Sequence, residues 1–273
     1  MNATATASLR GLAWFDALTA DPAPQGNYPA SLRVSDAALG DYPARWLAIV
    51  PDADNPFVRC RNGEVGLIEG WSLASAVNAA VAADRQRPRK RAIIAIIDVP
   101  SQAYGRREEA YGLHQALAAA TGAYAAARLA GHPVIGLLVG KAMSGAFLAH
   151  GYQANRLLAL QDDAVMVQAM GKQSAARVTL RSVEELDKIA ARIPPMAYDI
   201  ASFASLGLIW RLLTVSPATA PSPHDLDTVR TALTAALADI LADPQRDLRC
   251  RLGAPHRQVS SQVRNMLRAQ WHG

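Results

Sequence analysis

The chain has 273 residues, 51% of them hydrophobic and 19% charged, which is enough to bury a sizeable core in one large domain or in one domain with appendages. Two cysteines without a Cys-x-x-Cys pair exclude a disulfide scaffold and give no zinc signature. The net charge of +5 is compatible with nucleic acid, but the basic stretches at 85–91 and 246–268 lack the interleaved aromatic residues that stack on bases, so we expect no nucleic-acid partner.

The beginning of the chain carries few signals of regular structure. Residues 1–45 are rich in proline, aspartate and alanine and lack the pattern of a signal peptide, and no apolar run in the chain is long enough to cross a bilayer. We therefore expect a cytoplasmic protein without a membrane partner. The first strand is predicted at 46–50, a turn at 61–64 precedes a short apolar segment, and Ser72 is the predicted N-cap of a helix over 73–83.

The middle of the chain alternates strands and helices. Unbroken apolar runs at 92–97 and 134–139 are typical of strands in a sheet that is covered on both faces. Between them a long helix is predicted over 108–130, because apolar residues recur at intervals of three and four. Strand, helix and strand in this order indicate parallel pairing with a right-handed crossover. The apolar positions of the helix are Leu113, Leu117, Ala120, Tyr124 and Ala127.

The second half of the chain predicts two strands in quick succession, at 156–160 and 164–168. This short spacing favours a spiral of repeated strand-strand-helix turns over a plain dinucleotide fold. A composition of serine, proline, alanine and threonine marks 216–223 as a linker. The other elements expected here are helices at 147–154, 183–193, about 225–241 and 260–271, the last within a basic tail.

The segment Gly140-Lys-Ala-Met-Ser-Gly-Ala146 joins a buried strand to a helix. Backbone N–H groups at such a junction lack internal partners and can bind a negatively charged oxygen. A phosphate-binding loop is excluded, because Ala146 and Phe147 follow the second glycine where lysine and serine or threonine are required. A plain connection, a serine-hydrolase turn with Ser144 as nucleophile, and an oxyanion hole formed by the N–H groups of 144–146 remain open.

Four segments of the chain together resemble the gamma subunits of biotin-independent malonate decarboxylases. They are Asp98-Val-Pro-Ser-Gln-Ala-Tyr-Gly-Arg-Arg-Glu-Glu109, His132-Pro-Val-Ile-Gly136, Gly140-Lys-Ala-Met-Ser-Gly-Ala-Phe147 and Pro194-Pro-Met-Ala-Tyr198. The region is also similar, more distantly, to the alpha half of acetyl-CoA carboxylase carboxyltransferase. The corresponding turn of the carboxyltransferase is richer in glycine than 140–146 of this chain, where Ala142 and Met143 fill the middle. The chain also has no biotin-attachment Met-Lys-Met.

This resemblance implies an α/β, crotonase-type spiral of repeated β-β-α units with a helical C-terminal extension. The expected domains are an extension at 1–45, a carboxyltransferase-like domain at 46–213, and a linker with a basic helical tail at 214–273. The implied partners are a related beta subunit, with which the active site is shared, an acyl carrier protein subunit, and an ACP transferase subunit of the holoenzyme. No cofactor is expected to bind directly; the CoA-like prosthetic group of the carrier would enter the site, and no metal site is expected.

The implied reaction converts malonyl-S-acyl carrier protein to the acetyl thioester and carbon dioxide through an enolate, whose oxygen must be stabilised. The alternatives are a biotin-dependent carboxyltransferase subunit, a serine hydrolase, and a scaffold whose basic tail docks the carrier. The residues expected to hold the oxygen are Gly140, Ser144, Gly145 and Ala146. Those expected to line the substrate site are Tyr104, Lys141, Met143, Gln168 and Gly171, whereas His132 and His150 are predicted to be structural.

Overall fold

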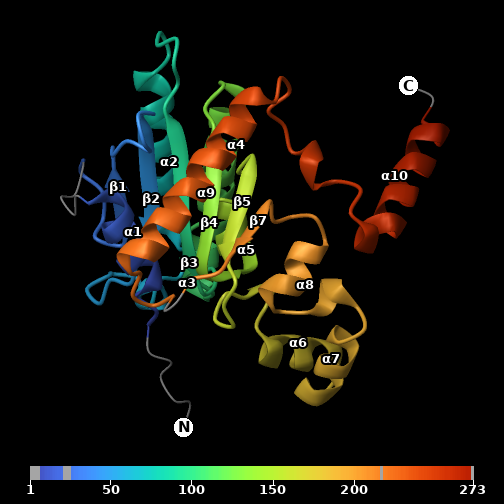
Figure 1. Ribbon diagram of the computed structural model, residues 1–273. Coiled ribbons are helices and arrows are strands. Elements are labelled where there is room, and N and C mark those ends of the chain that lie inside the picture. Colours follow the sequence, from blue (N-terminus) through green and yellow to red (C-terminus); the bar gives the residue numbers. More distant parts are fainter. Residues whose placement is uncertain (1–6, 21–25, 216–217, 272–273) are drawn as a thin grey trace.

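In the computed structural model, which describes residues 7–20, 26–215 and 218–271, one sheet forms the centre of the molecule (Figure 1). Its order is β1-β2-β3-β4-β5-β7, with β6 paired to β4, and every pair is parallel except β1 with β2. The strands are β1 (Leu32–Ser35), β2 (Ala44–Ile49), β3 (Ala92–Val99), β4 (Val134–Met143), β5 (Arg156–Leu160), β6 (Val167–Gln168) and β7 (Arg211–Leu213).

Helices cover both faces of this sheet (Figure 1). α1 and α9 pack on one face and touch each other, while α2 and α4 pack together on the opposite face. A group of small helices, α6 to α8, lies beyond the β7 edge. The helices are α1 (Arg10–Thr19), α2 (Leu67–Ala83), α3 (Arg106–Ala110), α4 (Leu113–Leu129), α5 (Ser144–Ala149), α6 (Lys172–Thr179), α7 (Val183–Ala190), α8 (Ile200–Ser205), α9 (Pro223–Ala242) and α10 (Gln258–Gln270).

The expected spiral of β-β-α units is confirmed by a second, short ladder beyond the main sheet. After a register shift between Ile97 and Val99, β3 pairs again with β4 through Ala142. The end of β4 then pairs with β6, and Val65 forms a parallel bridge with Gln102. The end of β4 and the segments that follow β2, β3 and β5 thus form this small ladder after the strands have paired in the large sheet. The candidate functional site lies at this ladder.

The central elements agree with the sequence pattern. All eight residues of β3 are buried, as expected of a strand covered on both faces. On α4, Leu113, Ala120, Tyr124 and Ala127 are buried and Leu117 packs at the edge of the core, which confirms the predicted face. α2 and α4 approach closely at Gly70, where a Cβ atom would lie only 2.8 Å from the backbone of Ala116. The abundance of small residues permits this contact.

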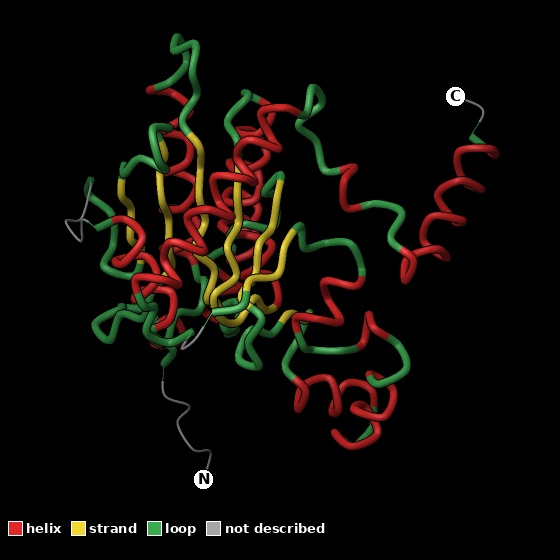
Figure 2. The backbone as a smooth tube through the Cα atoms, viewed as in Figure 1, coloured by secondary structure: helices red, strands yellow, loops and turns green. Residues whose placement is uncertain are grey.

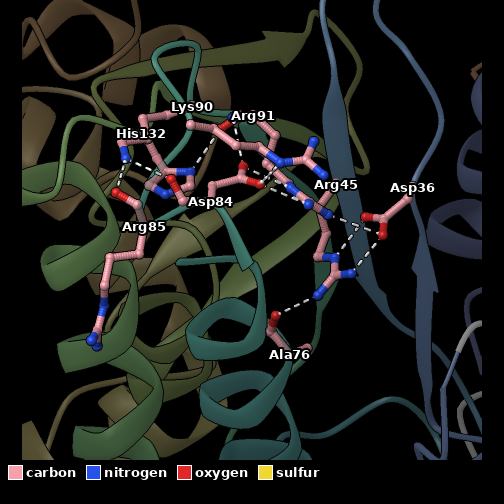
Figure 3. A network of polar contacts seen from close by, with 9 residues as sticks. Asp36, Arg45, Ala76, Asp84, Arg85, Lys90, Arg91 and His132 are labelled. Atoms are coloured by element: carbon pink, nitrogen blue, oxygen red, sulfur yellow. Dashed lines mark hydrogen bonds and ion pairs between the residues drawn. The ribbon is translucent and has the colours of Figure 1, made fainter. Parts of the chain in front are cut away.

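A network of charged groups fixes the end of the sheet where β3 begins, which is the end away from the small ladder (Figure 3). Asp84 accepts hydrogen bonds from the backbone and guanidinium of Arg91, and Arg91 also reaches Asp36, which pairs with Arg45. Burial by itself would raise the pKa of Asp84, but the hydrogen bonds and charge of Arg91 outweigh it and lower the pKa to about 2. This network joins the end of α2 to the start of β3.

Several predicted boundaries were wrong. α2 begins at Leu67 and has Gly66 as its N-cap, so Ser72 lies inside the helix. The buried carboxylate of Glu69 accepts the Gly66 N–H at 3.0 Å and makes this early start possible. The long helix expected over 108–130 is divided into α3 and α4 at Gly112, whose φ of 84° is left-handed.

The second half also differs from expectation in places. β4 continues to Met143, so most of the predicted turn is strand, and α5 ends at Ala149 rather than 154. The polar helix α6 was not predicted. Of the predicted linker at 216–223, residues 216 and 217 lie outside the described residues.

The C-terminal extension ends in α10, which lies away from the sheet (Figure 2). None of its residues is buried, and its apolar side chains are among the most exposed of the described residues. Among the described residues, no helix is both long and apolar enough to cross a bilayer.

Candidate functional site

The candidate site is built around a sharp change of direction at Ser144, where β4 ends and α5 begins. Ser144 has a φ of 57°, a left-handed conformation that is uncommon for residues other than glycine. Such backbone strain persists only where the surrounding structure holds it, and it clusters at functional sites. The surroundings of Ser144 are therefore informative.

Hydrogen bonds from two loops hold the Ser144 side chain. Its hydroxyl lies 2.8 Å from the carbonyl oxygen of Ala169, to which it donates, and 3.1 Å from the hydroxyl of Tyr104. Because a serine hydroxyl has one proton and that proton is directed at Ala169, Tyr104 must donate to Ser144. The order of donation is therefore Tyr104 to Ser144 to Ala169, and it joins the loop after β3 to the loop after β6.

A third contact fixes the next residue. The backbone N–H of Gly145 donates to Oε1 of Gln102 at 2.7 Å. A Cβ atom on Gly145 would lie 2.3 Å from the same oxygen, so glycine leaves the space in which this acceptor sits. The N–H group that the sequence suggested for a ligand oxygen thus already has a neutral oxygen acceptor in the protein.

A cavity of about 310 Å³ opens beside the turn. Its polar wall comes from Ser144, Gly145 and Gln168, and the amide of Gln168 donates to the carbonyl oxygens of Pro195 and Ala197. The remaining wall is largely apolar. It consists of Ala142, Phe147, Leu148, Tyr152, Val167, Ala169, Pro194, Pro195, Ala197, Phe203 and Leu206.

The structure brings some of the predicted residues together at this cavity. Ser144, Gly145 and Gln168 line the cavity. Tyr104 is 48% exposed and does not line it, but its hydroxyl forms a hydrogen bond with that of Ser144. Ala146 is fully buried, in the first turn of α5.

Other predicted residues have different surroundings. Gly140 does not line this cavity but packs against Asp98, since a Cβ atom there would lie 2.1 Å from Oδ1 of that carboxylate. The side chain of Met143 is buried and that of Lys141 is exposed, while the Lys141 N–H donates to Asp98 at 3.0 Å. Gly171 is exposed, at the N-cap of α6, and a Cβ atom there would meet nothing within 4 Å.

His150 is a structural residue, as the sequence predicted. It is fully buried, its Nε2 lies 2.9 Å from the carbonyl oxygen of Ile96, and its Nδ1 lies 3.0 Å from the hydroxyl of Tyr124. A carbonyl can only accept, so Nε2 carries the proton and Nδ1 accepts from Tyr124. Burial lowers the pKa of His150 to about 4, so the ring is neutral at physiological pH. Its two nitrogens are engaged away from Ser144, so His150 cannot act as a base for the Ser144 hydroxyl.

Sequence reasoning missed several parts of the site. Gln102 lies 43 positions before Gly145, and the apolar wall at 194–206 comes from a later part of the chain, beyond α7. Gln102 was inside a segment that resembled the family, but no periodicity or motif marked its side chain. Pro194 and Pro195 belong to a segment that resembles the family, but the sequence does not place them at the cavity. Their place opposite the turn depends on how the chain returns after α7.

The spiral of β-β-α units, with a turn and a cavity at its small ladder, defines a carboxyltransferase-like fold of the crotonase type. The same fold is found in the transcarboxylase 12S enzyme, whose structure matches with a TM-score of 0.60 at 19% identity over 86% of this chain and 41% of that chain. Within this class, the chain belongs to the malonate decarboxylase gamma subunits, whose family model matches residues 60–271.

Two kinds of relative agree with this assignment. The chain is 68% identical to a chain of a Pseudomonas malonate decarboxylase hetero-tetramer solved in complex with coenzyme A, with a TM-score of 0.93, covering 96% of this chain and 99% of that one. A hetero-tetramer from Pseudomonas in complex with malonate contains a chain that is 66% identical, with a TM-score of 0.90 and the same coverage. The malonyl-S-ACP:biotin-protein carboxyltransferase MADD of Malonomonas rubra is 32% identical over 76% of this chain and 69% of its own length.

Proposed function

We propose that this chain and a related beta subunit together decarboxylate malonyl-S-acyl carrier protein to acetyl-S-acyl carrier protein and carbon dioxide. The observation that carries the proposal is the cavity beside the strained Ser144–Gly145 turn, in a member of the malonate decarboxylase gamma subunits. The Pseudomonas relatives were solved with coenzyme A and with malonate, which supports a malonyl thioester as the substrate class.

In the proposed step, the bond between the α-carbon and the carboxylate of the malonyl group breaks. Its electron pair moves onto the α-carbon and the thioester oxygen, carbon dioxide leaves, and the resulting enolate takes up a proton at the α-carbon. The step needs a site that stabilises the enolate oxygen more than the ground-state carbonyl. We assign this role to the backbone at Ser144–Ala146, with the N–H of Gly145 as the main donor.

The apolar wall of the cavity suits the other half of the reaction. A carboxylate loses favourable hydration next to side chains such as Phe147, Val167 and Phe203, whereas carbon dioxide carries no charge. The same wall keeps water from the enolate. Tyr104 and Gln168 stand at the polar side, where we place the thioester, and Lys141, Met143 and Gly171 belong to the surroundings of the bound substrate in this proposal.

The proposal extends to the assembly. Residues 46–213 carry the site, and the segments at 1–45 and 214–273 flank it. The beta subunit closes the shared site, the carrier protein brings its CoA-like prosthetic group into it, and an ACP transferase subunit completes the holoenzyme in the cytoplasm. The support for an assembly is that Pseudomonas malonate decarboxylase was solved as a hetero-dimer and as hetero-tetramers.

A biotin-dependent carboxyltransferase subunit is the second candidate, because the Malonomonas rubra relative transfers the carboxyl group to a biotin protein. The higher identity to the Pseudomonas enzyme, 68% against 32%, favours the first. The two candidate functions are distinguished by measuring acetyl-carrier formation by mass spectrometry in the absence of biotin. The measurement is made with this chain alone, with a beta-type partner alone, and with both together. Turnover in the mixture alone supports the proposal, and turnover that requires a biotinyl protein contradicts it.

A further inference from the structure

The Gly145 N–H and the side chain of Gln102 form the contact from which this inference starts. Gln102 belongs to the loop after β3, where its backbone bridges to Val65, so its position is set by the small ladder. Its Oε1 accepts the Gly145 N–H at 2.7 Å, which is a good hydrogen-bond length. Glycine at 145 makes this approach possible, as a Cβ atom would lie 2.3 Å from Oε1.

One N–H group makes one strong, nearly linear hydrogen bond. The Oε1 atom of Gln102 therefore occupies the position that an enolate oxygen would need in order to accept from the Gly145 N–H. Either the substrate oxygen displaces Gln102, or Gly145 is not the donor.

The turn does not depend on Gln102 for its shape. Ser144 is held on its other side by its bond to the Ala169 carbonyl and by the donation from Tyr104. Both contacts remain when the Gln102 side chain rotates away. Gln102 is itself only half-buried, so a rotated carboxamide can be solvated.

We propose that Gln102 is an internal competitor: its Oε1 occupies the Gly145 N–H in the free protein and yields that position to the oxygen of the substrate. The inference rests on the proposed function. A hydrogen bond to a charged oxygen is shorter and roughly twice as strong as one between neutral groups. The enolate therefore displaces the neutral amide oxygen readily, whereas a neutral thioester carbonyl exchanges one ordinary bond for another. The exchange favours the charged state over the ground state, which is the requirement for catalysis.

The test uses the assembled complex of this chain with its beta-type partner and malonyl-carrier protein. Gln102→Met keeps the length of the side chain but removes the acceptor, and Gln102→Glu keeps the acceptor and gives it a negative charge. We expect Gln102→Met to raise kcat/KM about 2- to 12-fold, the net worth of one neutral hydrogen bond. We expect Gln102→Glu to lower it by at least about tenfold, because a carboxylate holds the N–H more strongly and repels the enolate.

Hydrogen exchange on the same complexes without substrate provides a second readout. One amide in the peptide covering 143–149 should lose protection in Gln102→Met and keep it in Gln102→Glu. Gln102→Ala replaces the methionine variant if that variant does not assemble. The competition is overturned if the wild-type complex is active and Gln102→Met leaves kcat/KM unchanged or lowers it. A wild-type complex without turnover instead contradicts the proposed function, and the inference falls with it.

Discussion

Gly140→Ala offers a sharp test of how the end of β4 is packed. A Cβ atom at this position would lie 2.1 Å from Oδ1 and 2.4 Å from Cγ of Asp98. The carboxylate has little freedom to move, because it is 5% exposed and accepts from Ser8 Oγ at 2.5 Å, Gly11 N at 3.2 Å and Lys141 N at 3.0 Å. Overpacking a core costs about 1–3 kcal/mol, and weakening a hydrogen bond to a charged group about 1.5–3 kcal/mol. We therefore expect Gly140→Ala to lower the free energy of unfolding by roughly 3–5 kcal/mol.

The assay is urea unfolding followed by circular dichroism, with Gly122→Ala as the matched control. Gly122 lies on an exposed position of α4, and a Cβ atom there meets nothing within 4 Å, so the same substitution should raise stability by about 0.5–1 kcal/mol. A Gly140→Ala variant within about 0.5 kcal/mol of the wild type would refute the packing argument. If such a variant were stable but inactive in the complex, Gly140 would have the direct role in catalysis that the sequence predicted.

Three further predictions concern individual side chains. The pKa of His150 is about 4 in the folded protein against an ordinary value of 6.5, so the unfolded chain takes up a proton first as the pH falls. The stability that neutral His150 contributes is complete above pH 6.5 and decreases toward pH 4. Urea unfolding should therefore show a free energy of unfolding that is about 2 kcal/mol lower at pH 5 than at pH 7.5, and His150→Gln should remove this difference. The same pH dependence in His150→Gln as in the wild type would contradict the prediction. Gly171→Ala should leave turnover of the complex within about twofold, because a Cβ atom there has open space; a large loss would indicate the close approach of ligand that the sequence suggested. Iodoacetamide, with mass spectrometry as the readout, should label the exposed Cys250 and spare Cys60, because burial and Glu69 raise the pKa of the Cys60 thiol. Labelling of Cys60 in the folded chain would show that its surroundings open to solvent.

Much of the sheet could be predicted from the sequence because its signals are local. The apolar runs that became β3 and β4 are continuous, and the spacing of apolar residues on α4 is regular. The start of α2 was mispredicted because its cap is not Ser72 but a glycine whose N–H is bound by Glu69 three residues later. α6 was missed because it is polar and buries none of its residues.

The candidate site was predicted only where its signals are also local. The strand-to-helix junction identified Ser144 and Gly145, both of which line the cavity. The partner of the Gly145 N–H could not be predicted, because Gln102 reaches it across the small ladder. The position of Gly140 against Asp98 likewise depends on the register between β3 and β4, which a single sequence does not reveal.

The most direct test of the proposed function is acetyl-carrier formation from malonyl-carrier protein by the mixture of this chain and its beta-type partner, without biotin, for the wild type and Gly145→Val. The valine side chain would enter the space of Gln102 Oε1 in front of the N–H. Loss of one oxyanion donor typically lowers kcat about 10²- to 10³-fold. We expect a loss of this size in a complex that still assembles, and no loss in Gly122→Ala. Full activity of Gly145→Val would contradict it, and loss of activity only on charge reversal of Arg264 and Arg268 would indicate a scaffold that docks the carrier.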